Sequence, residues 1–214
     1  MSKESYAYVR KVLHELLYKT DKILRELGCR YTISHGSLIE YQRGAPIYHD
    51  DDIDIRVDSR DFHRVRAYIG GAVKIDEANN VTFTKYWGDP NWYHVDLITR
   101  EHDPYFNKNF PISLDLVTSN SCSNGFWERY DIDFDNLRCV KFMDIDTFAP
   151  SETDTHKVLL NGYGANYLRP NYEPYELMSA ADIIMRRVPP VRPSKSGISA
   201  AQRRIPVKFP KKNL

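Results

Sequence analysis

The run Asp50-Asp51-Asp52-Ile53-Asp54-Ile55 constrains the fold of this chain more than any other segment. Four carboxylates in five positions repel one another at neutral pH, and a divalent cation is the simplest way to offset that repulsion. Because side chains alternate along a strand, Asp52 and Asp54 would point to one face while Ile53, Ile55 and Val57 point into a core. Two carboxylates on one strand face can hold one or two hard metal ions. The pattern therefore predicts a half-buried strand with a metal site suited to transferring a phosphate-linked group.

The size and composition indicate one globular domain. At 214 residues the chain is long enough for a single well-buried core. No apolar run approaches the length of a membrane span, and the first residues lead into an amphipathic pattern instead of a secretory apolar core. The three cysteines lack C-x-x-C spacing, which indicates reduced thiols. We therefore expect a cytoplasmic protein with no transmembrane segment.

The last part of the chain has a different character from the rest. Between Arg186 and Leu214 there are nine Lys or Arg residues, five prolines and no Asp or Glu. We expect a single catalytic domain over residues 1–185, followed by a basic, proline-rich tail over 186–214 that is extended or disordered. The tail shows no repeated interleaving of aromatic and basic residues and no known nucleic-acid-binding motif, so nucleic acid is not the favoured partner.

Apolar periodicity and turn residues predict an α/β arrangement around one mixed sheet flanked by helices. The predicted helices cover residues 5–27, 38–43, 59–69, 151–160 and 174–187, and the predicted strands cover 30–34, 53–57, 73–75, 81–86, 92–99 and 137–142. The stretch 99–136 is rich in Asn, Asp and Ser, and we predict an irregular excursion over the surface there.

Two further features are expected near the acidic strand. Gly36-Ser37 follows a predicted strand and opens a helix, so its backbone can approach a phosphate. Asp96 lies mid-strand between apolar residues, where an unpaired carboxylate would be costly to bury. A salt-bridged structural aspartate explains Asp96 equally well by itself, but beside Asp52 and Asp54 we favour a third metal ligand. His94 shares the strand face of Asp96 and could line the site.

Two blocks of the sequence resemble the LicD-type phosphotransferases, a family that includes fukutin-related proteins. Gly36-Ser37-Leu38-Ile39, Arg43 and the acidic run resemble a pattern of Gly-Thr/Ser-Leu-Leu-Gly, an Arg seven residues after the first Gly, and Pro-Trp-Asp-Asp-Asp-Ile-Asp. Phe148-Ala149-Pro150, Leu159-Leu160 and the segment 163–170 resemble the family's later "P…L…YG-x-x-Y…P" block. The chain departs from the family where Glu40 replaces the second Gly, where Tyr48-His49 replaces Pro-Trp, and in an interval one residue shorter.

The resemblance implies an enzyme with a nucleotidyltransferase-type fold. In that family a phospho-alcohol, such as phosphocholine or ribitol phosphate, passes from a CDP-linked donor to a glycan hydroxyl. By this resemblance Gly36 and Ser37 would bind donor phosphate, and Asp52 and Asp54 would hold Mg²⁺ or Mn²⁺. Asp96 would complete the metal site or take the acceptor's proton, while Arg43 would neutralise phosphate charge.

Other functions fit parts of the pattern. A calcium loop of EF-hand type fails because Ile55 stands where Gly is needed and Asp61 where a bidentate Glu is expected. A glycosyltransferase D-x-D motif would need a larger nucleotide-binding region before it. Transfer of a nucleotidyl group from an NTP to a small molecule or RNA is the strongest alternative, because the same fold and metal triad support it. A non-catalytic nucleotide-binding protein is the remaining one.

Overall fold

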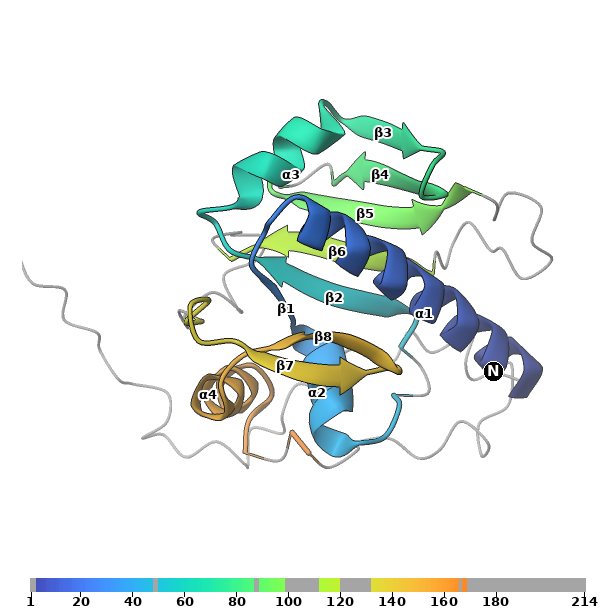
Figure 1. The fold of residues 1–214 in the computed structure, drawn as a ribbon. Coiled ribbons are helices and arrows are strands. Elements are labelled where there is room, and N and C mark those ends of the chain that lie inside the picture. The colour runs from blue at the N-terminus through green and yellow to red at the C-terminus, as the bar shows by residue number, and fades with distance from the viewer. Residues whose placement is uncertain are drawn as a thin grey trace, which may run out of the picture.

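The computed structural model describes residues 3–47, 50–86, 89–98, 112–119, 132–165 and 167–168. At its centre is a six-stranded sheet in the order β1-β2-β6-β5-β4-β3 (Figure 1). The strands of this sheet are β1 (Tyr31–Ile33), β2 (Asp52–Val57), β3 (Val73–Asp76), β4 (Val81–Lys85), β5 (Trp92–Leu97) and β6 (Ser113–Thr118). A separate hairpin consists of β7 (Arg138–Phe142) and β8 (Ile145–Ala149). The helices are α1 (Lys3–Glu26), α2 (His35–Arg43), α3 (Phe62–Ile69) and α4 (Glu152–Tyr163).

The central sheet is mixed, as the sequence predicts for an α/β protein. β2 and β6 pair in parallel, and every other neighbouring pair in this sheet is antiparallel. The β7–β8 hairpin packs beside the edge strand β1, where the hydroxyl of Thr32 donates a hydrogen bond to the carbonyl oxygen of Phe148 at 3.2 Å. This contact attaches the two-stranded sheet to the edge strand β1 of the central sheet, which lies next to β2.

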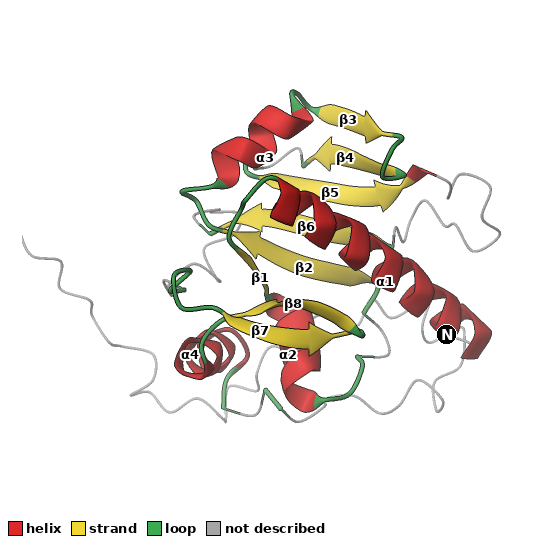
Figure 2. Cartoon of the chain, viewed as in Figure 1, coloured by secondary structure: helices red, strands yellow, loops and turns green. Residues whose placement is uncertain are grey.

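One face of the central sheet is apolar and is covered by helices. Alternation along β2 buries Ile53, Ile55 and Val57 on this face. Helix α1 crosses the face, and Figure 2 shows it in front of β2, β6 and β5. The hydroxyl of Tyr31, which shares the face, bonds to Asp21 of α1. Helix α3 is joined to β5 by the aromatic rings of Phe62 and Tyr93, whose centroids are 6.1 Å apart. The opposite face of the sheet therefore remains for polar side chains.

The predicted helix boundaries are confirmed to within a few residues for α1 and α4. Gly28 follows α1 with a φ of 65°, as expected of a residue that ends a helix. Ser151 is the N-cap of α4, and its hydroxyl oxygen accepts a hydrogen bond from the backbone N–H of Asp154 at 3.1 Å. Helix α4 continues past the predicted end at Leu160 to Tyr163, and Gly164 follows it with a φ of 80°.

The prediction of an irregular segment over 99–136 is wrong for Ser113–Thr118. These residues form β6, which is buried at all six positions and lies between β2 and β5. β8 was also not predicted; it follows β7 through a turn at Met143 and Asp144, whose φ angles are 51° and 63°. The predicted helix 174–187, the tail 186–214 and the rest of the 99–136 segment apart from residues 112–119 and 132–136 lie outside the described residues. Within the described part, no helix combines the length and apolar character needed to cross a membrane.

Candidate metal centre

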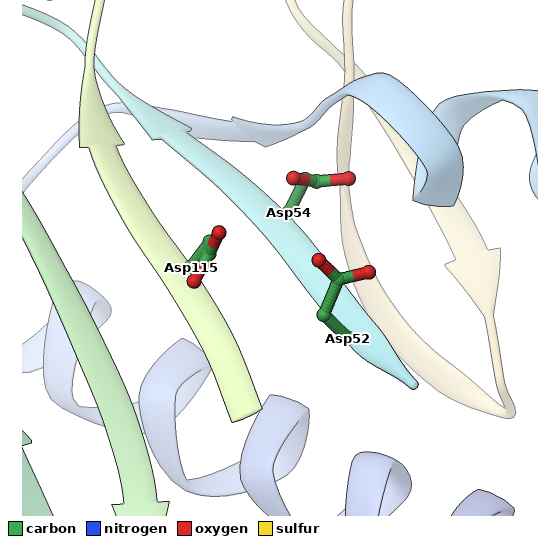
Figure 3. A group of neighbouring side chains, drawn as sticks. All are labelled: Asp52, Asp54 and Asp115. Atoms are coloured by element: carbon green, nitrogen blue, oxygen red, sulfur yellow. The ribbon is translucent and has the colours of Figure 1, made fainter. Parts of the chain in front are cut away.

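Three carboxylates meet on the polar face of the sheet. Asp54 of β2 is the register partner of Asp115 of β6, and Asp52 lies two residues before Asp54 on the same face. Each side chain contributes an oxygen, and these oxygens all lie within 4.8 Å of one another (Figure 3). Carboxylate oxygens are the ligands that hard divalent cations prefer. The three residues together could hold a metal ion.

The third carboxylate of this group is Asp115 and not the predicted Asp96. Asp96 lies on β5 opposite Thr82 of β4, and β6 separates β5 from β2. Asp96 is not one of the three carboxylates that lie together, because β6, which was not predicted, lies between β5 and β2. Asp96 still shares the polar face, since His94, two residues before it, is the register partner of Asp115.

The start of α2 packs directly against Asp54. The backbone N–H of Gly36 donates to Oδ2 of Asp54 at 3.0 Å, and the hydroxyl oxygen of Ser37 accepts from the backbone N–H of Asp54 at 3.0 Å. A Cβ at Gly36 would lie 2.6 Å from Oδ2 of Asp50, so a side chain has no room there. The strand-to-helix turn predicted at Gly36-Ser37 is therefore present, and it lies beside β2. The contact of Gly36 and Ser37 with a donor phosphate stays a prediction.

The described part of the chain leaves the negative charge of these carboxylates only partly offset. Burial raises the pKa of Asp54 well above its usual range, and the charges of Asp52 and Asp115 raise it further. The pKa of Asp50 is also raised well above its usual range, first by burial and then by the charge of Asp52. Burial is the main cause that raises the pKa of Asp52 as well. A bound divalent cation would remove this repulsion, so the residues present fit such an ion.

A buried cation lies at the other end of the same strand face. Arg56 follows Asp54 by two residues, and its charge opposes a small part of the rise that burial causes in the pKa of that carboxyl. Its Nη2 is 3.4 Å from Nε2 of His35, and burial together with the Arg56 charge lowers the pKa of His35 to about 3. His35 is therefore neutral at physiological pH. Arg56 is not among the predicted site residues, although the alternation Asp52, Asp54, Arg56 is visible in the sequence.

Helix α4, which carries part of the second block of the family resemblance, packs against α2. The guanidinium of Arg43 donates from Nε and Nη2 to the carbonyl oxygen of Tyr167, at 3.2 and 2.7 Å. Tyr163, at the end of α4, has a pKa raised well above its usual range by burial and then by nearby aspartates, Asp54 first among them. The two blocks thus meet around α2. The predicted contact of Arg43 with phosphate stays a prediction.

His94 adds a hydrogen bond to the third carboxylate. Its Nδ1 is 2.7 Å from Oδ1 of Asp115, and this hydrogen bond is the main cause that raises the pKa of His94. A hydrogen bond of this kind fixes the orientation of a carboxylate that binds metal. The expectation that His94 lines the site agrees with this position.

Comparison with known proteins adds no assignment. No protein-family model matches the chain, and a search of curated proteins also gives no match. The fold and the site therefore define the class by themselves. They describe an α/β protein with a mixed sheet whose polar face carries three carboxylates able to hold a metal ion.

Proposed function

We propose that this chain is a metal-dependent transferase with a nucleotidyltransferase-type fold. It moves a phospho-alcohol group, of the phosphocholine or ribitol phosphate kind, from a CDP-linked donor to an acceptor hydroxyl on a glycan. The observation that supports this most is the group of Asp52, Asp54 and Asp115 beside the N-terminus of α2. The motifs that resemble the LicD-type family supply the choice of donor and acceptor.

Each part of the polar face has a role in the proposed reaction. Asp52, Asp54 and Asp115 would hold Mg²⁺ or Mn²⁺, which neutralises charge on the phosphate oxygens when bound. The N-terminus of α2 carries partial positive charge and would bind the donor phosphate at Gly36 and Ser37, which also contact Asp54. Asp96 lies on β5, next to the strand that carries Asp115, and it would take the proton of the acceptor hydroxyl in the proposed reaction.

A pair of matched variants tests these roles. Asp115→Asn keeps an oxygen that can accept a hydrogen bond from His94, but it removes one negative charge from the three carboxylates. We expect it to weaken Mn²⁺ binding by roughly tenfold or more, measured by calorimetry. Asp96→Asn should bind Mn²⁺ like the wild type and lose turnover. If Asp96→Asn loses Mn²⁺ while Asp115→Asn keeps it, this assignment of the ligands is wrong.

The donor is tested by thermal unfolding with candidate nucleotides. The melting temperature should rise with CDP-choline, CDP-ribitol or CDP-glycerol when Mn²⁺ is present, because a ligand that binds only the folded state stabilises it. Asp54→Asn should abolish this rise. Consumption of an NTP with release of pyrophosphate would instead indicate nucleotidyl transfer, and binding without any product would indicate a non-catalytic protein. If no nucleotide stabilises the wild type, the transferase proposal fails.

A further inference from the structure

A stacked pair of aromatic rings lies at the end of the β4–β5 hairpin. The ring centroids of Tyr86 and Trp92 are 4.5 Å apart, with an angle of 27° between the ring planes. His94 contacts both rings, with its centroid 5.3 Å from that of Tyr86 and 5.7 Å from that of Trp92. The side chain of Tyr86 is 40% exposed, so this aromatic pair is not part of the core. We call Tyr86 and Trp92 the aromatic pair below.

The aromatic pair is on the same face of the sheet as the carboxylates. Trp92 is the register partner of Val117, and His94 is the partner of Asp115, so these four residues share the polar face. The Nδ1 of His94 bonds to Asp115 at 2.7 Å. A single side chain, His94, therefore connects the aromatic pair to the candidate metal centre.

The backbone around the aromatic pair is held in place. The N–H of Tyr86 donates to the carbonyl of Trp92 at 2.9 Å, which extends the pairing of β4 and β5 by one step. Asp89 is buried, and its Oδ1 accepts from the N–H of Asn91 at 2.8 Å. The carbonyl of Asn91 in turn accepts from the N–H of Thr118 on β6 at 3.1 Å. These hydrogen bonds connect Tyr86 to Trp92 and Asn91 to the strand that carries Asp115.

The ligand that fits this arrangement has a flat aromatic end and a phosphate end. An exposed tyrosine ring that already stacks on an indole can extend the stack to a third flat ring, and nucleobases bind proteins in this way. A nucleotide separates its base from its phosphates by one ribose. The polar face likewise separates the aromatic pair from the carboxylates by one side chain, His94.

We propose that the exposed ring of Tyr86 stacks on the nucleobase of the nucleotide-linked donor, while the carboxylates hold the metal and phosphate end. This inference rests on the proposed function, because it requires a nucleotide as ligand. It assigns Tyr86 a role in binding the base and assigns Trp92 the role of supporting the Tyr86 ring from behind.

Calorimetric titration of Tyr86→Leu tests the inference with three probes, which are Mn²⁺ alone, pyrophosphate with Mn²⁺, and CDP with Mn²⁺. Loss of one base–aromatic stack should weaken CDP binding by about 10- to 100-fold. Binding of Mn²⁺ and of pyrophosphate should stay unchanged, because neither carries a base. Tyr86→Phe keeps the ring and should bind CDP like the wild type. Tyr18→Leu, at a tyrosine of α1 that is 57% exposed, is the control and should change nothing.

The possible results separate this inference from the proposed function. If Tyr86→Leu binds CDP as tightly as the wild type does, the stacking role is wrong and the transferase proposal stands. If the variant loses pyrophosphate and CDP equally, Tyr86 acts through the carboxylates, which also overturns the inference. If the wild type binds Mn²⁺ but no nucleotide, both proposals fail.

Discussion

At Gly36 the candidate site has no space for even one side-chain carbon. Because the Cβ of an alanine would lie 2.6 Å from Oδ2 of Asp50, that carboxylate or the start of α2 must move. We expect Gly36→Ala to lower the free energy of unfolding by about 1–3 kcal/mol and to weaken Mn²⁺ binding. Gly71→Ala is a matched control, since a Cβ at Gly71 would meet nothing within 4 Å. Urea unfolding and Mn²⁺ titration of both variants measure this, and equal behaviour of the two would contradict it.

The aspartates of the acidic run also predict how stability depends on pH. Burial, followed by the charge of Asp52, raises the pKa of Asp51 to about 6, and the pKa values of Asp50 and Asp54 are raised as well. A raised carboxyl pKa means that the folded state binds the proton more tightly than the unfolded state does. The resulting stabilisation is complete below the unfolded pKa of about 4 and is lost as the pH rises through the folded values.

We therefore expect the metal-free protein to be more stable at pH 5 than at pH 8. Urea unfolding in the presence of a chelator measures this difference. Mn²⁺ should reduce the loss at pH 8, because a bound cation stabilises the ionised carboxylates. Asp54→Asn should show a flatter pH profile, since it removes one of the titrating groups. A metal-free stability that rises between pH 5 and pH 8 would be the opposite of this expectation.

The residue scale also shows what a sequence can and cannot predict about this site. Asp52, Asp54 and Gly36 could be recognised because strand alternation and a strand-to-helix turn are local patterns. The third carboxylate could not be chosen in the same way. Asp96 stands in Val-Asp-Leu and Asp115 in Leu-Asp-Leu, so local sequence makes them equivalent. Only the order of strands in the sheet, with β6 next to β2, selects Asp115.

At the scale of elements, an ion pair joins α1 to α2. Arg10 of α1 donates from Nη1 to Oε2 of Glu40 on α2 at 2.9 Å, and Oε2 also accepts from the backbone N–H of Ile47 at 3.2 Å. Glu40 is buried, and it occupies the position where the LicD-type pattern has its second Gly. In this chain, Glu40 therefore holds α1 against α2, the helix that begins at the candidate site.

We expect Arg10→Met to lower the free energy of unfolding by about 3 kcal/mol, because Glu40 would be left buried without its cation. The double variant Arg10→Met with Glu40→Gln should regain at least half of this loss, since an amide oxygen can still accept from Ile47. Chemical unfolding of the wild type, Arg10→Met, Glu40→Gln and the double variant completes the double-mutant cycle. A loss below about 0.5 kcal/mol in Arg10→Met would show that the pair does not stabilise the fold.

The elements that the sequence predicted well have clear local signals. α1 has a long apolar stripe that ends at Gly28, and α4 begins at Ser151, which caps it. β6 lacked such a signal because its six residues stand inside a stretch rich in Asn, Asp and Ser. β8 was missed for another reason. Its turn uses Met143 and Asp144 at positive φ, and a methionine there gives no warning of a turn that usually takes Gly or Asn.

At the scale of the whole molecule, the central sheet has one covered face and one face that carries charge. β2 and β6 are central strands with many buried positions, while β3 is an edge strand whose Val73 and Ile75 are exposed. We expect the amides of β2 and β6 to exchange with deuterium most slowly and those of β3 to exchange fastest. Hydrogen exchange followed by NMR or mass spectrometry measures this order. Slower exchange in β3 than in β6 would show that the centre of stability lies elsewhere.

The parallel pairing of β2 with β6 has a consequence for how the protein folds and binds metal. A hairpin cannot make a parallel pair, so Asp115 reaches Asp54 only after a long stretch of chain has closed. Before that closure, only Asp52 and Asp54 of the three carboxylates stand near each other. A cation that needs all three carboxylates therefore binds the folded protein and not a partly folded one. Its binding free energy then stabilises only the folded state.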